Sequence, residues 1–190
     1  MQKSAPVILL EHPRPQNPSR HQDVVNAPLS ANLFSPYISS LLKSKAIPVE
    51  ILDAHLLGWS IDRTLEELSK RSPKLLGVHT LYLWDNTREV LGMLSTLKEQ
   101  GIKAHINLFG YYPTFAYQGI LEQFPFIDSV TIGEPEHTFL ELAQRVMGVG
   151  PHHNLPDIKG LAYRLNNEGR GEVIKNSPRA LISDLDSLPF

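Results

Sequence analysis

The 190-residue sequence predicts an α/β fold in which helices cover both faces of an open, five-stranded parallel sheet. Two observations support this prediction. Five short apolar runs alternate along the chain with segments whose apolar residues recur every three or four positions, a pattern typical of strands followed by amphipathic helices. Repeated strand–helix–strand units connect by right-handed crossovers, which place parallel strands side by side in one sheet.

Each expected strand is a short apolar run. The strands are predicted at 6–10, 48–53, 75–80, 103–109 and 128–132. The helices are predicted at 34–45, 61–68, 85–100, 115–124 and 136–147. Gly101 directly follows the third helix, where a glycine typically ends a helix in the left-handed conformation. The second strand is expected at an edge of the sheet.

The sequence changes character after residue 148, which predicts two parts, an α/β domain at 1–148 and an extension at 149–190. Residues 150–154 have the composition of a linker. The runs 158–165 and 172–175 flank an Asn-Asn-Glu-Gly turn and predict a β-hairpin. The final segment, 182–190, is expected to be a connector toward a further domain.

Composition excludes several classes of function. With 18 basic and 20 acidic residues the formal net charge is −2, which argues against a nucleic-acid interface built from bulk charge and against an anionic-membrane anchor. No apolar run approaches the roughly 20 residues of a membrane span. The sequence has no cysteine, so a disulfide scaffold, a catalytic cysteine and a cysteine-ligated iron–sulfur cluster are excluded within these residues. We expect a reducing, cytoplasmic setting and no complete catalytic apparatus in this chain.

An irregular stretch at 11–33 follows the first strand. It holds four prolines and little periodicity, and it is longer than an ordinary connecting loop. Two interpretations stay open: a binding loop or lid, and a disordered segment.

An ordered set of motifs occupies the second half of the chain. The motifs are Gly110-Tyr111-Tyr112-Pro113-Thr114, the segment 126–130 around Asp128, Gly133-Glu134-Pro135-Glu136-His137-Thr138-Phe139, the segment 158–164 with Gly-Leu-Ala-Tyr-Arg, and the segment 184–190. Together they resemble the N-terminal cobalamin-binding domain of cobalamin-dependent radical SAM enzymes. The resemblance extends over nearly the whole chain and is poorest across 11–33.

The resemblance implies a flavodoxin-like, Rossmann-like sheet with the corrin resting on the carboxyl ends of the strands. The nucleotide tail of the cobalamin would be buried between sheet and helices, in the base-off form. The cofactor-binding residues it implies are Thr80, Leu81, Tyr82, Gly110, Tyr111, Pro113, Thr114, Gly133 and Glu134. Glu136 and Thr138 begin the next helix, where a first-turn anion and helix capping are the alternative roles.

The sequence departs from the family pattern at the turn after the fourth strand. Phe109 stands where the family has its first turn glycine, and Tyr111 and Tyr112 are unusually bulky. These rings would either narrow the approach of the corrin or flank its flat face.

Two histidines are candidates for a cobalt axial ligand. Asp53-Ala54-His55-Leu56-Leu57-Gly58 fits the Asp-x-His-x-x-Gly motif by which methionine-synthase-like domains supply a lower axial histidine. In those domains the motif follows the first strand, whereas here it follows the second, so we interpret His55 as a solvated loop histidine. His12, after the first strand, is the other candidate for a metal ligand.

The function predicted from these residues is a cobalamin-binding module of a radical SAM methyltransferase-type enzyme. It would present cobalt to a catalytic domain that holds S-adenosylmethionine and an iron–sulfur cluster, either in cis beyond residue 190 or in trans. The alternative is a degenerate flavodoxin-like domain that serves as a protein-interaction module without cofactor. A phosphoacceptor receiver is disfavoured because His79-Thr80, and not an aspartate, ends the third strand. A flavin-binding flavodoxin is disfavoured because residues 11–15 do not form a phosphate loop.

Overall fold

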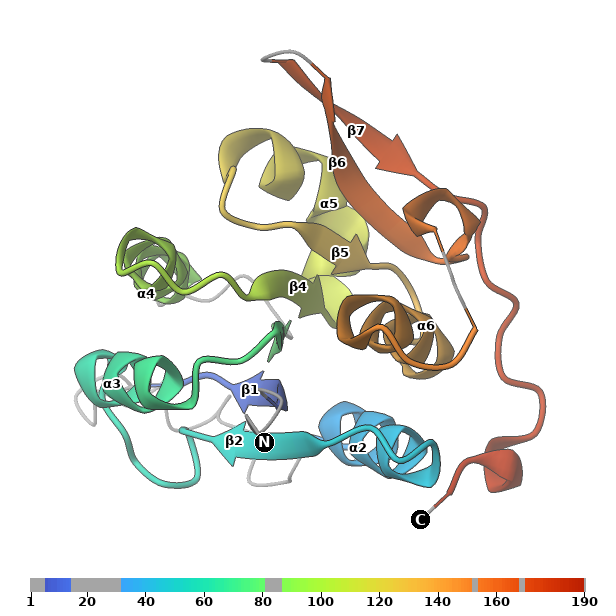
Figure 1. Cartoon of the computed structure of the whole chain (residues 1–190), viewed down its shortest axis with the longest axis horizontal. Helices are drawn as coiled ribbons and strands as arrows, with labels where there is room; N and C mark the ends of the chain where they lie inside the picture. Colours follow the sequence, from blue (N-terminus) through green and yellow to red (C-terminus); the bar gives the residue numbers. More distant parts are fainter. Residues whose placement is uncertain (1–5, 15–31, 81–86, 152–153, 168–169, 190) are drawn as a thin grey trace, which may run out of the picture.

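The computed structural model of the chain describes residues 6–14, 32–80, 87–151, 154–167 and 170–189. Within these residues a seven-stranded sheet has the order β2-β1-β3-β4-β5-β6-β7 (Figure 1). Its strands are β1 (Val7–Glu11), β2 (Val49–Asp53), β3 (Leu75–His79), β4 (His105–Phe109), β5 (Ser129–Thr131), β6 (Leu161–Asn167) and β7 (Arg170–Lys175).

Helices cover both faces of this sheet, as predicted. The helices of the described residues are α2 (Phe34–Ser44), α3 (Ile61–Arg71), α4 (Thr87–Glu99), α5 (Tyr111–Gln123) and α6 (Glu136–Met147), with short 3-10 turns η1 (Leu155–Asp157) and η2 (Leu185–Ser187). One apolar core lies under α3, α4 and α5, and a second core lies under α2 and α6. Alternate residues of each strand face one core or the other, because successive side chains of a strand point to opposite faces.

The prediction of a five-stranded, purely parallel sheet is wrong in its extent. The strands β1 to β5 pair in parallel, with β2 at an edge as expected. However, β6 pairs antiparallel with β5, and β7 pairs antiparallel with β6. The predicted hairpin therefore extends the sheet, because the open edge of β5 presents backbone groups that β6 can pair. The division of domains at residue 148 stays a prediction.

Helix α5 begins at Tyr111, four residues earlier than predicted. The apolar spacing indicated a start at Phe115, but Phe115 is one of the most exposed apolar side chains, at 86%. Pro113 lies in the first turn, where the backbone N–H that proline lacks has no partner within the helix. The early start places Tyr111 and Pro113 directly at the end of β4.

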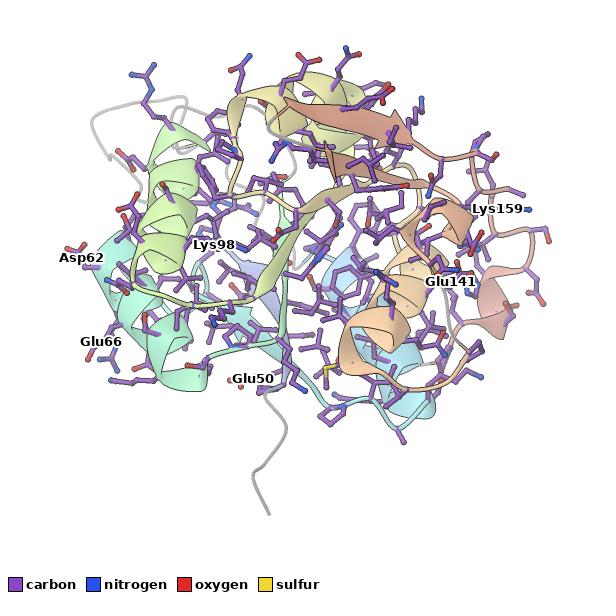
Figure 2. All side chains as sticks on the ribbon, turned by 45° about the horizontal axis from the view of Figure 1, so that its top comes forward. Glu50, Asp62, Glu66, Lys98, Glu141 and Lys159 are labelled. Carbon is purple, nitrogen blue, oxygen red and sulfur yellow. The ribbon has the colours of Figure 1, made fainter. Side chains whose placement is uncertain are left out.

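The segment after β7 lies against the domain. It runs past α6 toward the end of the sheet where α2 lies (Figure 1). Arg179 forms an ion pair of 2.6 Å with Glu141 of α6, which is labelled in Figure 2. Leu188 near its end is buried. The segment is thus held to the domain at Arg179 and at Leu188, while residues 183–187 between them are exposed.

The helices were compared with the length and apolar character of a membrane-spanning helix. Among the described residues we find no helix with both the length and the apolar character that a bilayer span requires.

Candidate cofactor-binding site

The carboxyl ends of the parallel strands meet at one edge of the sheet. Glu11 at the end of β1 pairs in register with Asp53 of β2 on one side and with His79 of β3 on the other, and His79 pairs with Phe109 of β4. The strand order reverses between β1 and β3, because the chain leaves β1 for β2 and returns to β3 on the other side. In open α/β sheets a ligand typically binds outside the carboxyl ends at such a switch point.

A buried carboxylate lies at this switch point. Oε1 of Glu11 accepts hydrogen bonds from Ser35 Oγ at 2.6 Å and from Asn32 Nδ2 at 2.7 Å, while Oε2 lies 2.9 Å from His79 Nδ1. Burial raises the pKa of Glu11, but the hydrogen bonds and the charge of His79 outweigh it and lower the pKa to about 2. Glu11 is therefore ionised at neutral pH, and Nδ1 of His79 carries the hydrogen that joins the two.

Four buried polar atoms at this edge have no hydrogen-bond partner among the described residues. They are Arg14 Nε, His79 Nε2, Thr80 Oγ1 and Glu136 Oε2. A buried polar atom without a partner costs about 1 to 3 kcal/mol, so native proteins keep few of them. Their concentration at the carboxyl edge is what a binding site for a polar ligand would show.

A tight backbone approach links the ends of β3 and β4. Gly110 has a φ of +118°, and a Cβ at this position would lie 2.4 Å from the carbonyl oxygen of Thr80. Thr114 Oγ1 donates to the carbonyl of Gly110 at 2.8 Å and accepts from the backbone N–H of Gly133 at 3.1 Å. The structure thus brings four of the predicted site residues, Thr80, Gly110, Thr114 and Gly133, together from the turns after β3, β4 and β5.

Other predicted residues bind the C-terminal segment. Oε2 of Glu134 accepts a hydrogen bond of 2.7 Å from the backbone of Ile182. Thr138 donates to the carbonyl of Lys159 and accepts from Arg179, so the expectation that Thr138 caps the helix is wrong. Pro135 occupies the N-cap position without a side-chain hydrogen bond, and Glu136 is the acidic residue of the first turn.

Aromatic rings occupy the space beside the strand ends. Phe109 is fully buried on the face covered by α2 and α6, with its ring centroid 5.5 Å from that of His79 and 5.8 Å from that of Phe139. Tyr111 is 55% exposed at the rim, 5.9 Å from Phe34. The tyrosine is therefore placed to meet a large ligand, while Phe109 fills space just below the edge.

The two histidines proposed as cobalt ligands have separate surroundings. The Asp53 carboxylate accepts a hydrogen bond from the backbone N–H of Leu56 at 2.8 Å, so the motif around His55 closes a turn. His55 is half-buried and its pKa is lowered by burial. His12 is buried, Nδ1 lies 3.0 Å from the carbonyl of Pro13, and burial lowers its pKa to about 4. Cobalt ligation by either histidine stays a prediction.

Part of the predicted site lies outside the described residues. This applies to Leu81 and Tyr82, which the resemblance implies beside Thr80. Sequence reasoning missed the pairing of Glu11 with His79. Glu11 directly follows the strand predicted at 6–10 and His79 lies next to the end of the strand predicted at 75–80, but that these two strands are neighbours follows from the strand order of the folded sheet.

Comparison with curated proteins gives two relatives, although no protein-family model matches the chain. It is similar to the anaerobic magnesium-protoporphyrin IX monomethyl ester cyclase of Synechocystis sp., with 26% identity over 180 residues that cover 95% of this chain and 34% of the cyclase. It is also similar to an uncharacterized methyltransferase of Pyrococcus horikoshii, with 26% identity over 160 residues that cover 81% of this chain and 31% of the relative. The chain therefore spans about a third of the length of both relatives.

Solved structures share the fold. OxsB, a cobalamin-dependent S-adenosylmethionine radical enzyme solved with aqua-cobalamin and S-adenosylmethionine bound, superimposes with a TM-score of 0.70 and 20% identity, over 94% of this chain and 23% of OxsB. The chain has the fold of one part of a cobalamin-dependent radical SAM enzyme. The radical S-adenosylmethionine methyltransferase TsrM of Kitasatospora setae matches with a TM-score of 0.68 and 20% identity, over 93% of this chain and 31% of TsrM. The resemblance predicted from the motifs is thereby confirmed.

Proposed function

We propose that this chain is a cobalamin-binding module that presents cobalt to a separate catalytic domain. The observation that carries the proposal is the group of buried polar atoms at the carboxyl edge that have no partner in the described part of the chain, on a fold shared with an enzyme solved with aqua-cobalamin. When bound, cobalamin supplies a cobalt atom that can carry a methyl group. The corrin would rest on the strand ends beside Tyr111, and the nucleotide tail would enter between the sheet and α2 and α6 in the base-off form.

The residues at the edge suit a large, amide-rich ligand. Gly110 brings backbone to the rim without a side chain, and Thr114 holds the turns after β4 and β5 together. The hydroxyl of Thr80 and the exposed backbone around Gly133 would then bind polar groups of the cofactor. Pro113 lies in the first turn of α5 and Glu134 accepts a hydrogen bond from the backbone of Ile182, next to these turns. Leu81 and Tyr82 belong to the proposed site by resemblance alone.

The catalytic partner would be a radical SAM domain, supplied in cis or in trans. The chain covers only 23% of OxsB and 31% of TsrM, which leaves room in those proteins for further domains. S-adenosylmethionine and an iron–sulfur cluster would be held there, because this sequence has no cysteine to bind a cluster. The reaction itself, methyl transfer as in the methyltransferase TsrM or ring closure as in the cyclase relative, would be carried out by such a partner domain and not by the module alone.

A second candidate function is a protein-interaction module without cofactor. Phe109 favours it, because this ring is fully buried beside His79, where the tail would enter. The two functions differ in one measurement. Purified protein is mixed with hydroxocobalamin and desalted, and its visible spectrum is recorded. The cobalamin module retains about one cobalt per chain, whereas a colourless eluate would leave only the interaction module.

A matched pair of variants tests whether the retained cobalamin binds at the carboxyl edge of the sheet. Thr80→Val removes a hydroxyl that has no partner among the described residues, and it should reduce the retained cobalamin. Thr96→Val removes a hydroxyl that donates to the carbonyl of Gly92 on the exposed side of α4, and it should leave retention unchanged. Equal retention by both variants would contradict the placement of the cofactor at this edge.

A further inference from the structure

The buried histidine at the end of β3 has one ring nitrogen paired with Glu11, while the other has no partner among the residues that the structure describes. Nδ1 of His79 is held by Glu11, and Glu11 is in turn held by Ser35 and Asn32. Nε2 is buried and has no hydrogen-bond partner within the described part of the chain. The side chain is 1% exposed, so water does not freely satisfy this atom. A ring that is oriented by a charged partner and has an unsatisfied nitrogen is prepared to bind something else.

We propose that Glu11 and His79 form the contact that recognises the nucleotide tail of cobalamin, with Nε2 of His79 as the atom that hydrogen-bonds it. This inference rests on the proposed function. With Nδ1–H donated to Glu11, Nε2 accepts a hydrogen bond from a ribose hydroxyl of the tail when the ring is neutral, and donates one to the phosphate or to the benzimidazole nitrogen when the ring is protonated. The Glu11–His79 pair thereby selects corrinoids that carry a tail over corrinoids that lack one.

The position of His79 explains why the tail, and not the corrin, reaches it. His79 is the last residue of β3, and its side chain lies on the face covered by α2 and α6, against Phe34 at 5.7 Å and Phe109 at 5.5 Å. The corrin is a wide ring with bulky substituents, so it has to lie outside the strand ends. The tail is narrow enough to enter between the sheet and the helices.

Of the two aromatic rings that pack against His79, Phe34 is the one that can move. Phe34 begins α2, is only half-buried, and makes edge contacts with both His79 and Tyr111. Phe109, by contrast, is fully buried against Phe139. Entry of the tail at the rim would therefore require Phe34 to move, because this ring lies against the His79 ring.

The test compares two corrinoids that differ only in the tail. Hydroxocobalamin and cobinamide, which lacks the nucleotide, are titrated into wild-type protein and into His79→Phe, and the dissociation constants are measured from the visible spectrum. His79→Phe should weaken cobalamin binding about tenfold and leave cobinamide binding within about twofold, since one hydrogen bond in a buried site is worth roughly that factor. His79→Gln, which keeps a polar group, should recover part of the loss.

A histidine at the opposite edge provides the control. His105 is partly buried at the start of β4, and its Nε2 is satisfied by Ser129 Oγ at 2.8 Å. His105→Phe should leave the affinities for both corrinoids unchanged. The spectrum of bound cobalamin should be the same in wild type and in His79→Phe, because His79 binds the tail and not the metal.

Three results overturn the inference. An equal loss for both corrinoids would show that His79 acts on the domain or on the corrin, and a changed cobalt spectrum in the variant would make His79 a metal ligand. Where His79→Phe does not fold, nitrogen NMR of the wild-type imidazoles replaces it, and the His79 signal should move on addition of cobalamin but not of cobinamide. A signal that moves equally with both, or with neither, is the third result. Wild-type protein that binds neither corrinoid is a different outcome, because it overturns the proposed function itself.

Discussion

The two ends of the parallel sheet differ in how far their buried polar groups are hydrogen-bonded. At the amino end, Asp128 Oδ2 accepts hydrogen bonds from Lys98 Nζ at 2.9 Å and from the backbone of Ile106 at 2.7 Å, with Lys98 labelled in Figure 2. His105 is paired there with Ser129. At the carboxyl end, polar atoms of equal or deeper burial have no partner among the described residues. The polar groups named at the amino end are thus hydrogen-bonded within the protein, whereas those at the carboxyl end are not hydrogen-bonded to any described residue.

The presence or absence of a hydrogen-bond partner distinguishes polar groups that stabilise the fold from polar groups that are available to bind a ligand. An open hollow of about 500 Å³ lies at the amino end, lined by Lys74, Lys103, His105, Arg145 and Val146. Its volume would make that hollow a candidate site. Buried atoms that are unsatisfied among the described residues point instead to the carboxyl end, and we give them more weight because each costs free energy that a bound ligand would recover.

The largest expected difference comes from two glycines with positive φ. Gly110→Ala at the carboxyl end places a Cβ 2.4 Å from the Thr80 carbonyl at a φ of +118°, whereas Gly101→Ala near the amino end has a φ of +85° and meets no atom within 4 Å. Gly110→Ala should lower the free energy of unfolding by about 3 to 4 kcal/mol and Gly101→Ala by about 1 kcal/mol. Urea unfolding measures both. Equal losses would mean that backbone strain, and not the close approach, dominates at Gly110.

Acid should destabilise the protein in two windows. The pKa of Glu11 falls from an ordinary 4.5 to about 2, and those of His12 and His105 fall from 6.5 to about 4. A lowered pKa in the folded state means that the unfolded chain binds the proton first, so stability is lost as pH falls. His12 and His105 contribute to a loss between pH 6.5 and 4, and Glu11 contributes about 3 kcal/mol that is lost between pH 4.5 and 2.

Two variants assign these windows to individual residues. Glu11→Gln should be less stable at neutral pH and should lose the decline below pH 4.5, while His105→Gln should flatten only part of the decline above pH 4, since His12 remains. Thermal unfolding at a series of pH values tests this. A Glu11→Gln protein that still loses stability as steeply as wild type below pH 4.5 would contradict the assignment.

Removing one serine hydroxyl at each end should give similar costs in stability and different effects on binding. Ser129→Ala removes the partner of both His105 and Asn107 and should cost about 2 kcal/mol, with no effect on cobalamin affinity. Ser35→Ala removes a 2.6 Å hydrogen bond to Glu11 and should cost about 1.5 kcal/mol. It should also weaken cobalamin binding about threefold, because Glu11 orients His79. Parallel titrations would refute this if Ser129→Ala had the larger effect on affinity.

The sequence predicted the parallel part of the sheet and several residues at its edge, because strand and helix periodicity are local signals. Gly110, Thr114 and Gly133 were predicted together and are joined by hydrogen bonds. The sheet position of the hairpin was not predictable in the same way, since pairing of β6 with β5 depends on an edge that only the folded sheet creates. The Glu11–His79 pair likewise joins residues 68 positions apart, and the pairing depends on strand order.

The smallest expected change in stability, that of Thr80→Val, is zero or a gain where most substitutions in a buried site cause a loss. Thr80 is buried and its hydroxyl has no partner among the described residues, so Thr80→Val should leave the ligand-free protein equally stable or about 0.5 to 1 kcal/mol more stable. Thr131→Val, which removes a hydrogen bond of 3.1 Å to Asn107, should instead cost about 1 kcal/mol. If the carboxyl end awaits a ligand, Thr80→Val gains stability and loses cobalamin affinity at once. A Thr80 variant that loses stability as Thr131→Val does would mean that its hydroxyl already has a partner in the free protein, and the contrast between the two ends would then weaken at this residue.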